Sequence, residues 1–388
     1  MNNQSNSSIV SPTDTTPGTE NYIDAPDIVL KVCYSFFGTL GIVGNLLVCV
    51  VFIKLKRLRK TLTNVFILNQ SLIDLTIATI FIVLMFVPKV YVMRDNIGGD
   101  IVCAIWVSEY ILWGLFISST YNLTALSIER YLAICHPVYH RNKVTIGKVK
   151  IVVVAVWVLG YIRECYWPTL YHNINGVCHV KDWPTKTVRA VVGWVVFLTE
   201  YVLPLGIMTF SYGKIIVALR KRSKKKGQGG PQPASVCPAP ASSRNDDAQG
   251  DPRHAAPSVG QAQPGARTND AGKKEDDTIS RARKNVTKTM LIVSVTFAVC
   301  WSPTSIIFFA DNQEIVDIHY DGPLYYFTVI MVFCNMCVNP FIYALKYKDF
   351  RAGVREIFRC GRSRVGAADQ FESVQTQSTA LRENPSRT

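Results

Sequence analysis

Residues 103–137 read CAIWVSEYILWGLFISSTYNLTALSIERYLAICHP, an apolar stretch with one acid near its start and a charged pair at its end. The acid is Glu109, and the charged pair, Glu129 and Arg130, is followed directly by Tyr131. Because hydrocarbon rejects ions, this pair must lie at a membrane face or inside a protected bundle of helices. The stretch therefore predicts a membrane-spanning helix, and the rest of the chain can be placed relative to it.

Charge is clustered along the chain instead of being spread evenly. The 388 residues have a formal net charge of +14, yet residues 32–53, 290–310 and 323–345 contain no charged side chain. Each of these stretches is long enough to cross a hydrocarbon core of about 30 Å as a helix. Between residues 61 and 87 the only charge is Asp74. These features predict an all-α membrane protein that crosses the bilayer several times.

Basic clusters indicate how the spans are oriented. We expect spans at residues 28–53, 62–88, 103–137, 151–170 and 188–219, a sixth that begins after Lys288, and a seventh that ends at Lys346. Clusters of lysine and arginine follow the odd-numbered spans and precede the even-numbered ones. The positive-inside rule then places the N-terminus outside the cell and the C-terminus in the cytoplasm. The basic cluster at residues 220–226 directly follows an apolar span, so we interpret it as a membrane-face cluster and not as a nucleic-acid patch.

The remaining segments lack the pattern of a membrane span. Residues 1–27 are polar, without the order of a signal peptide, and predict a disordered extracellular tail with N-glycosylation acceptor sequences at Asn3 and Asn6. Within the predicted bundle of residues 28–346, residues 227–280 predict a flexible third intracellular loop. Residues 347–360 predict a short amphipathic helix on the membrane surface, and residues 361–388 a disordered cytoplasmic tail.

Several polar residues lie inside the spans, where a charged group costs about 2.5–3.5 kcal/mol near the centre. The second span contains Asp74, the third Ser119, and the seventh Asn335 and Asn339. If the spans form a bundle, these carboxylate, hydroxyl and amide groups gather at a similar depth. Such an oxygen-rich set suits a hard cation such as sodium. A purely structural hydrogen-bond network that joins the first, second and seventh spans is the alternative.

Prolines fall inside three of the later spans, at Pro204, Pro303 and Pro340. Each removes a backbone hydrogen bond and can bend its helix. Bent helices around a polar centre indicate a bundle with two arrangements. A transporter or channel, the alternative from another class, would be expected to show related halves or several charges along a conducting path. We find no internal repeat, and no HExxH, GxSxG or phosphate-loop motif of an enzyme.

The motifs, taken in order, match a known family. Residues 28–360 resemble the rhodopsin-like (class A) G-protein-coupled receptors, and among them the peptide-receptor branch. The matching motifs are Gly44-Asn45, Ser71-Leu72-Ile73-Asp74, Glu129-Arg130-Tyr131, Trp157, Pro204 with Tyr212, Phe297, Cys300-Trp301-Ser302-Pro303 and Asn339-Pro340-Phe341-Ile342-Tyr343. Each motif alone is weak, but the full set in the proper spans is specific. The resemblance implies a seven-transmembrane helix bundle at the plasma membrane that binds an extracellular ligand and activates heterotrimeric G proteins.

The resemblance also implies roles for individual residues. Arg130 would be restrained by Glu129 at rest and freed for the G protein on activation. Coupling and activation would involve Glu129, Arg130, Tyr131, Pro137, Val138, Tyr212, Asn339, Pro340 and Tyr343. The sodium site would comprise Asp74, Ser119, Trp301, Asn335 and Asn339. The other implied sites are a disulfide between Cys103 and Cys178, palmitoylation of Cys360, and kinase targets between Ser363 and Thr388 that recruit arrestin.

One spacing departs from the family pattern. Cys103 precedes Arg130 by 27 residues, counted from 103 to 130, which is two more than is usual in the family. We therefore expect a bulge or an extra half-turn at the outer end of the third span.

The resemblance leaves the ligand open. Leu112 occupies the position where amine receptors carry an aspartate, which speaks against a standard biogenic amine. Two other acids could supply a counter-ion, namely Glu109, which we expect at the rim, and Glu200. Glu200 is the stronger candidate because it lies about one turn before Pro204. It could equally pair with Arg163 of the fourth span, and the sequence does not decide between the two.

The acids of the third outer loop, together with the acidic N-terminal tail, predict a negative mouth that attracts a cationic ligand. We therefore favour a basic peptide as the ligand, with a small amine-like cation bound by Glu200 as the alternative. An acidic tail that serves only solubility is also compatible with the pattern. The loop acids are Asp311, Glu314, Asp317 and Asp321. The candidate pocket residues are Glu109, Leu112, Trp113, Phe116, Glu200, Trp301, Thr304 and Phe308.

Overall fold

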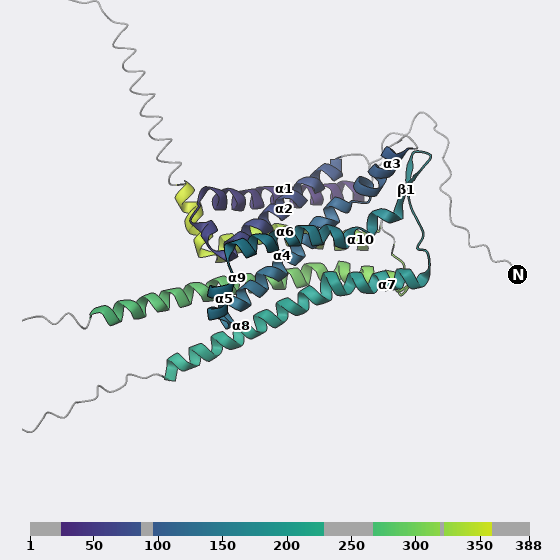
Figure 1. The fold of residues 1–388 in the computed structure, drawn as a ribbon. Helices are drawn as coiled ribbons and strands as arrows, with labels where there is room; N and C mark the ends of the chain where they lie inside the picture. The colour runs from purple at the N-terminus through teal and green to yellow at the C-terminus, as the bar shows by residue number, and fades with distance from the viewer. Residues whose placement is uncertain (1–24, 87–95, 229–266, 319–321, 359–388) are drawn as a thin grey trace, which may run out of the picture.

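Long helices that run alongside one another dominate the computed structural model, which describes residues 25–86, 96–228, 267–318 and 322–358 (Figure 1). The helices are α1 (Ala25–Lys54), α2 (Leu62–Phe86), α3 (Ile97–Val102), α4 (Tyr110–Cys135), α5 (Pro137–Lys143), α6 (Ile146–Glu164), α7 (Lys186–Val196), α8 (Leu203–Gln228), α9 (Arg267–Asn312) and α10 (Pro323–Lys346). Short 3₁₀ turns are η1 (Leu58–Lys60) and η3 (Trp167–Leu170), and π-helical turns are η2 (Cys103–Val107) and η4 (Phe197–Val202). A further helix covers residues 348–358.

The prediction of seven membrane spans is confirmed by the helix pattern. Six helical segments are long and apolar enough to cross a membrane, and a seventh comprises residues 146–170. α5 lies directly before this seventh segment, and the two are bent by 87° relative to each other. A helix satisfies all its backbone hydrogen bonds internally, which is what a segment in hydrocarbon requires. Large apolar side chains are exposed on the outside of the bundle, for example Val43, Val154 and Val299. The fold is therefore an all-α membrane bundle.

The third span contains the irregularity that its spacing predicted. The π-helical turn η2 occupies Cys103–Val107, and a break follows at Glu109, whose backbone is left-handed with φ of 58°. A π turn holds more residues per turn than an α-helix, so η2 and the break at Glu109 together take up the two surplus residues before Arg130. Regular helix resumes at Tyr110. The expected bulge is thus confirmed, and it places Glu109 at the junction between two helical segments.

A short hairpin covers the end of the bundle at which η2 lies, and we call this the hairpin end. Strands β1 (Tyr171–Ile174) and β2 (Val177–Val180) pair antiparallel, with Asn175 and Gly176 in the turn at φ of 52° and 85°. An Asn-Gly pair suits a two-residue turn because both residues tolerate positive φ. The predicted disulfide is confirmed, since Cys103 is bonded to Cys178 in β2. The bridge fastens the hairpin to the third span.

Close approach of two helices explains one glycine. A Cβ atom at Gly160 in α6 would lie 2.2 Å from the Ser118 Oγ and 2.6 Å from the Gly114 carbonyl oxygen of α4. Only a residue without a side chain lets the two backbones approach so closely. Ser118 Oγ also lies 3.4 Å from the Trp157 carbonyl oxygen, to which it donates a hydrogen bond. The α4–α6 contact therefore fixes the rotation of both helices, which positions the polar groups described below.

The segment boundaries differ from the prediction at the third intracellular loop. We expected the loop over residues 227–280, but α8 continues to Gln228 and α9 already begins at Arg267. Both helices extend beyond the rest of the bundle in Figure 1. The sequence of residues 267–284 is rich in lysine, arginine, aspartate and glutamate. Opposite charges three or four positions apart support a polar helix, which composition alone had suggested was a loop.

The predicted short helix after the seventh span is present over residues 348–358. Phe350 is 1% exposed and stacks on Phe52 of α1, with ring centroids 6.2 Å apart. Arg57, which precedes η1, forms an ion pair with Glu356 on the same helix. The helix therefore packs against the end of α1 through one apolar face and one exposed ion pair.

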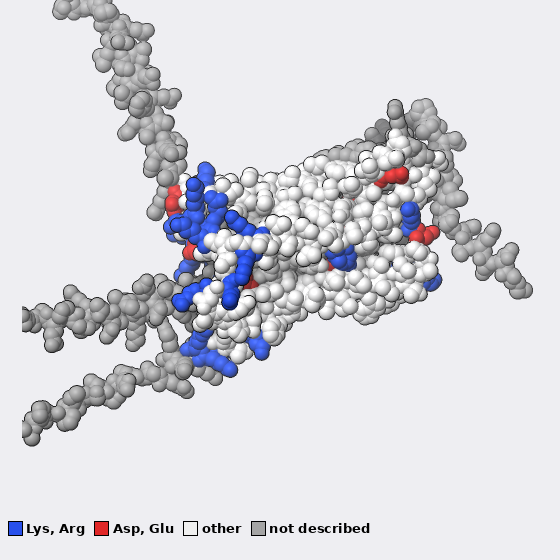
Figure 2. All heavy atoms as spheres, viewed as in Figure 1, with Lys and Arg blue, Asp and Glu red and all other residues white. Residues whose placement is uncertain are grey.

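Basic side chains gather at the end of the bundle opposite the hairpin, and we call this the basic end. Figure 2 shows blue surface at that end, next to the helix of residues 348–358, with a long white surface beyond it. The exposed members are Lys54, Lys56, Arg57, Lys60, Arg141, Lys143, Lys148, Lys150, Arg220, Lys221, Arg222, Lys346, Lys348 and Arg355. Basic charge clustered at one end and a long apolar surface beyond it are the pattern of a membrane-embedded bundle.

Candidate functional site

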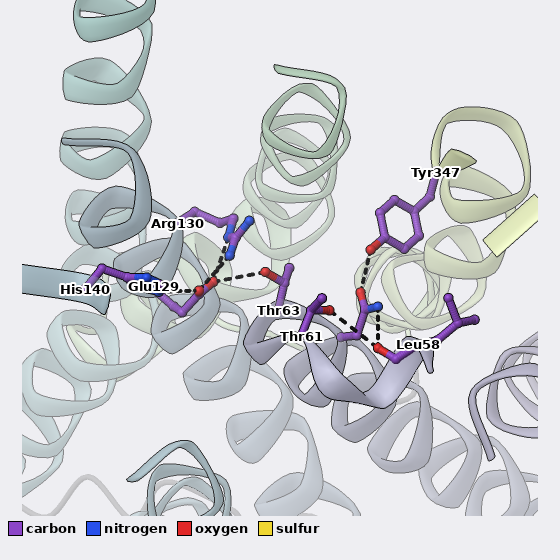
Figure 3. A network of polar contacts seen from close by, with 8 residues as sticks. Leu58, Thr61, Thr63, Glu129, Arg130, His140 and Tyr347 are labelled. Carbon is purple, nitrogen blue, oxygen red and sulfur yellow. Dashed lines mark hydrogen bonds and ion pairs between the residues drawn. The ribbon is translucent and has the colours of Figure 1, made fainter. Parts of the chain in front are cut away.

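A buried ion pair lies where α4 reaches the basic end (Figure 3). Arg130 donates from Nε to Oε2 and from its terminal guanidinium nitrogen to Oε1 of Glu129, both at 2.6 Å. The side chains are 13% and 4% exposed, respectively. Such a bidentate contact between adjacent residues holds the guanidinium against its own helix. The structure thus brings together the two residues for which the resemblance implied a resting-state contact.

Two residues that the sequence analysis did not select complete the surroundings of Glu129. His140 Nε2 of α5 lies 2.9 Å from Oε1, and the Thr63 hydroxyl of α2 donates to Oε2 over 3.3 Å. Figure 3 shows both side chains directed at the carboxylate from opposite sides. Glu129 is therefore the centre of a contact that links α2, α4 and α5. A histidine three residues after Pro137 carried no motif, so no signal in the sequence identified it.

The surface next to this pair is apolar and exposed. Val138 is 70% exposed, and its neighbour Tyr139 is also exposed, so α5 presents two apolar side chains among basic ones. Pro137 begins α5, where its missing N–H costs nothing. Tyr131 contacts His136 through its hydroxyl, with 3.0 Å between the phenol oxygen and Nε2. Exposed apolar residues rimmed by charge are typical of a protein contact surface.

A second polar contact links η1, α2 and the end of α10 (Figure 3). The Tyr347 hydroxyl donates to Asn64 Oδ1, and Asn64 Nδ2 donates to the Leu58 carbonyl oxygen over 2.6 Å. Burial raises the pKa of Tyr347, so its phenol stays protonated and able to donate. This corner fixes where the seventh span ends.

Two tyrosines implied in activation are fully enclosed between the helices. Tyr343 of α10 is buried, and its hydroxyl has no hydrogen-bond partner among the described residues. Tyr212 of α8 is buried as well. Neither forms a described hydrogen bond with Arg130. A buried unpaired hydroxyl is costly, so Tyr343 gains a hydrogen bond in any rearrangement that offers it a partner.

Asp74 is the centre of a buried cluster midway along the bundle. Its Oδ1 accepts hydrogen bonds from Gln70 Nε2 at 3.0 Å and from the Ser119 hydroxyl at 3.2 Å, and Oδ2 accepts one from Asn339 Nδ2 at 2.9 Å. All five residues predicted here are buried, namely Asp74, Ser119, Trp301, Asn335 and Asn339. The structure joins the first two with Asn339. Asn335 Oδ1 and Trp301 Nε1 have no hydrogen-bond partner in the described parts of the chain.

The fit of this cluster to a sodium ion depends on Gln70, which the sequence analysis missed. Its amide nitrogen lies 3.0 Å from Asp74 Oδ1 and 2.5 Å from Ser119 Oγ. These are the two neighbouring oxygens that a cation at Asp74 would have to bind together. An N–H donor already occupies the position between them, so the arrangement described here does not fit a cation. The structural hydrogen-bond network, the second of the two interpretations, describes it.

Aromatic side chains form a layer between the Asp74 cluster and the hairpin end. The ring of Phe116 meets that of Trp301 edge to face at 5.9 Å, and it lies 5.7 Å from the ring of Trp113. Phe333 of α10 joins from the other side, 5.4 Å from Phe116. Leu112 is buried in the core, and the Thr304 hydroxyl donates to the Thr328 carbonyl oxygen at 3.0 Å. Phe308 is half-buried on α9, on the hairpin side of Trp301.

The structure decides the partner of Glu200, which the sequence left open. Glu200 lies in the π-helical turn η4, and its carboxylate forms an ion pair with Arg163 of α6 at 2.7 Å. Arg163 also donates from Nε to the Thr199 hydroxyl at 2.8 Å. Glu164, the neighbour of Arg163 at the end of α6, is also buried. Glu200 therefore belongs to an interhelical cluster of two acids and one cation, and its charge is matched without a ligand.

Glu109 lies near the hairpin and is half-buried, although we expected it exposed at the rim. The left-handed residue at the helix break aims the side chain differently from a helical one, which explains the difference. Burial raises the pKa of Tyr171 in β1 to about 12, and the charge of Glu109 adds to this shift, so the carboxylate lies close to that ring.

The negative mouth predicted for the third outer loop is partly neutralised. Asp311 pairs with Arg189 of α7 at 3.0 Å, and Glu314 pairs with Lys186 at 2.6 Å. Lysine and arginine at the start of the fifth span therefore offset two of the four acids, which spacing along the chain could not reveal. Asp317 is exposed, and Asp321 lies outside the described residues. Asn3, Asn6, Cys360 and residues 363–388, with their predicted modifications, also lie outside them.

Comparison with known proteins agrees with the membrane-spanning helix bundle described above. A family model described as the 7 transmembrane receptor (rhodopsin family) matches residues 44–343. The chain is 25% identical to galanin receptor 2b of Danio rerio over 390 residues, which covers 95% of this chain and 88% of the relative. It is 30% identical to a cholecystokinin receptor of Xenopus laevis over 356 residues, covering 82% and 74% of the two chains. Human cholecystokinin receptor type A is 27% identical, with 84% and 79% covered.

Proposed function

Since this chain belongs to the rhodopsin family of seven-transmembrane receptors, we propose that it binds an extracellular peptide and activates heterotrimeric G proteins in response. The observation that carries the coupling half of this proposal is the enclosed Glu129–Arg130 pair at the basic end. His140 of α5 contacts Glu129, and α5 exposes Val138 and Tyr139 at an end of the bundle that is rich in lysine and arginine. A cytoplasmic partner that docks on α5 would therefore meet the arginine as soon as Glu129 releases it.

The arrangement supports a two-state mechanism. In the structure Arg130 is bonded to Glu129, and the Tyr343 hydroxyl has no partner among the described side chains. A rearrangement of α8, α9 and α10 that frees Arg130 would let the buried tyrosines hydrogen-bond with it. A ligand drives such a change only by binding the second arrangement more tightly than the first. Prolines inside α9 and α10 are the points at which these helices can bend.

The ligand class rests on the relatives and on one acid. The galanin and cholecystokinin receptors, which are peptide receptors, match this chain over most of its length. Glu200 pairs with Arg163. We propose that Glu109 supplies the counter-ion for a basic group of the peptide. Its half-buried position beside the hairpin and above the aromatic layer supports this role. An alternative receptor for a small amine that uses Glu200 would first have to break the Arg163 ion pair.

The remaining partners follow from the orientation that we propose, with the hairpin end outside the cell and the basic end in the cytoplasm. Lysine and arginine at the basic end would contact anionic lipid head groups. A receptor kinase and arrestin would act on residues 363–388, and palmitate on Cys360 would anchor the preceding helix. Glycans on Asn3 and Asn6 require the N-terminus outside. An antibody to an N-terminal epitope on unpermeabilised cells tests this orientation.

The experiment that tests coupling measures ligand-independent nucleotide exchange on a panel of G proteins, with wild type compared with Arg130→Ala. We expect at least one G protein to respond to wild type and to lose that response in the variant. Arg163→Lys is the matched control, because this arginine lies on α6 and pairs with Glu200. Solute flux without any G-protein response, for any ligand, would instead support a transporter or channel.

The ligand class is tested by screening a peptide library against wild type, Glu109→Gln and Glu200→Gln. For a basic peptide, we expect the potency to fall about tenfold or more in Glu109→Gln, because a buried charge pair is worth at least about 1.4 kcal/mol. Potency should change little in Glu200→Gln. Equal losses in both variants, or none in Glu109→Gln, would remove Glu109 as the counter-ion.

A further inference from the structure

Gln70 of α2 occupies the centre of the longest chain of buried polar side chains in the described structure. Its side chain is fully buried, as are those of Asp74 and Asn122. Through its nitrogen it donates to Asp74 Oδ1 and Ser119 Oγ, and through its oxygen it accepts a hydrogen bond from Asn122 Nδ2 at 2.8 Å. A glutamine with every group engaged between two helices is a positioned part of the structure and not a surface residue that happens to be enclosed.

The direction of each hydrogen bond in this chain is determined by its two ends. The Trp157 indole of α6 can only donate, and it donates to Asn69 Oδ1 at 3.0 Å. Asn69 Nδ2 then donates to Asn122 Oδ1 at 2.9 Å, and Asn122 Nδ2 donates to Gln70 Oε1. An ionised Asp74 at the far end can only accept. The Gln70 amide must therefore direct its NH₂ group at the carboxylate, since the opposite orientation would place two acceptors against each other.

This orientation has a consequence for ions. The Asp74 carboxylate receives three neutral donors, from Gln70, Ser119 and Asn339. A hard cation would need Asp74 Oδ1 and the Ser119 oxygen as joint ligands, but the Gln70 nitrogen lies within 3.0 Å of both. The amide and the ion cannot occupy the same position. Hydrogen bonds to a charged group also supply part of the stabilisation that a bound cation would provide.

We propose that Gln70 is a built-in neutral replacement for a cation at Asp74, so that the resting bundle of this receptor is stable without sodium. The oriented amide chain from Trp157 holds the replacement in position and links α6 to Asp74. Replacing Gln70 with an apolar residue of similar length removes this donor and leaves the Asp74 carboxylate with one hydrogen bond fewer. The position beside Asp74 then becomes available, and sodium should bind there. The inference does not depend on the ligand or on G-protein coupling.

The test compares the melting temperature of the purified full-length receptor in detergent, in sodium chloride and in choline chloride at the same ionic strength. We expect no difference between the two salts for wild type. Gln70→Met should melt at a lower temperature in choline chloride, and its melting temperature should rise by about 2–3 °C in sodium, as expected when sodium exceeds its Kd about tenfold. The double variant Gln70→Met/Asp74→Asn, which lacks the carboxylate, should lose that rise.

Two results would overturn the proposal. One is a rise of about 2 °C or more in the melting temperature of wild type in sodium chloride that Asp74→Asn abolishes, because the site would then bind sodium with Gln70 present. The other is an absence of any sodium effect in Gln70→Met. If that variant does not fold, Asn122→Leu removes the Nδ2 donor that orients Gln70 through its Oε1, and it should gain sodium dependence in the same way. The comparison of salts on wild type requires no variant at all.

Discussion

Replacing His140 with phenylalanine tests whether the short helix α5 stabilises the resting arrangement of Glu129 and Arg130. The substitution removes the 2.9 Å contact between His140 Nε2 and Glu129 Oε1 and keeps an aromatic ring of similar size. Hydrogen bonds to a charged group contribute about 1.5–3 kcal/mol when buried. The His140 side chain is 20% exposed, so we take about 1–1.5 kcal/mol for this contact.

If the contact exists only in the resting arrangement, its loss shifts the free-energy difference between the resting and active arrangements by this amount, in favour of the active one. Since about 1.4 kcal/mol corresponds to a factor of ten, the ratio of active to resting receptor should rise about five- to tenfold. Ligand-independent GTPγS binding, measured in membranes with matched receptor amounts, reports this ratio directly. His136→Phe is the control, because His136 lies in the same turn and contacts Tyr131, not Glu129.

Other substitutions around Glu129 should change the basal signal by different amounts. Thr63→Val removes a longer contact of 3.3 Å to the same carboxylate, so its basal signal should rise less than that of His140→Phe. His140→Gln, which can still donate a hydrogen bond, should lie close to wild type. Equal basal signals in wild type and His140→Phe would refute the reasoning. So would an equal rise in His136→Phe, because the effect would then come from loosening α5 and not from Glu129.

Further predictions concern stability, measured as the melting temperature of the purified receptor. Arg163→Met leaves the acids Glu164 and Glu200 without their cation and should cost about 3–5 kcal/mol; adding Glu200→Gln should recover part of this loss, and no recovery would argue against the ion pair. Gly160→Ala places a Cβ atom 2.2 Å from Ser118 Oγ and should cost about 1–3 kcal/mol, whereas Gly206→Ala meets no atom within 4 Å and should be neutral or stabilising. Phe350→Ala opens the contact with Phe52 at a cost of about 3–5 kcal/mol, and the exposed Phe358→Ala is its control, which should change little.

Most properties that follow from a single stretch of sequence were predicted correctly, although the bounds of the third intracellular loop were not. A membrane requires about 20 apolar residues in a row, so the spans could be found from composition. The short helix over residues 348–358 followed from the spacing of its apolar and basic residues, and the irregular start of the third span from comparison with the usual family spacing. The motif around Arg130 and the cysteines of the outer disulfide were identified through resemblance. In each case the deciding information lies within one stretch or one motif.

Partner choice between helices was decided only by the tertiary structure. Glu200 had two plausible partners in the sequence, and the rotation of α6 against η4 brings Arg163 within 2.7 Å of it. His140 reaches Glu129 because α5 lies against the end of α4. A side chain contacts another helix through the rotation and separation of both, and neither quantity is written in the spacing along one of them.

The hydrogen-bond partners of Asp74 at the polar centre were likewise decided only by the tertiary structure, and Gln70 is the clearest example. The sequence placed Asp74, Ser119 and Asn339 at similar depth and left a cation and a hydrogen-bond network as alternatives. One turn of helix separates Gln70 from Asp74, but a glutamine at that spacing can equally face lipid. Packing against α4 and α6 sets its orientation, through Asn122, Asn69 and Trp157. The sequence by itself determined that an acid lies inside the membrane, and the tertiary structure decided which atoms neutralise it, because hydrogen bonds depend on distance and direction in three dimensions.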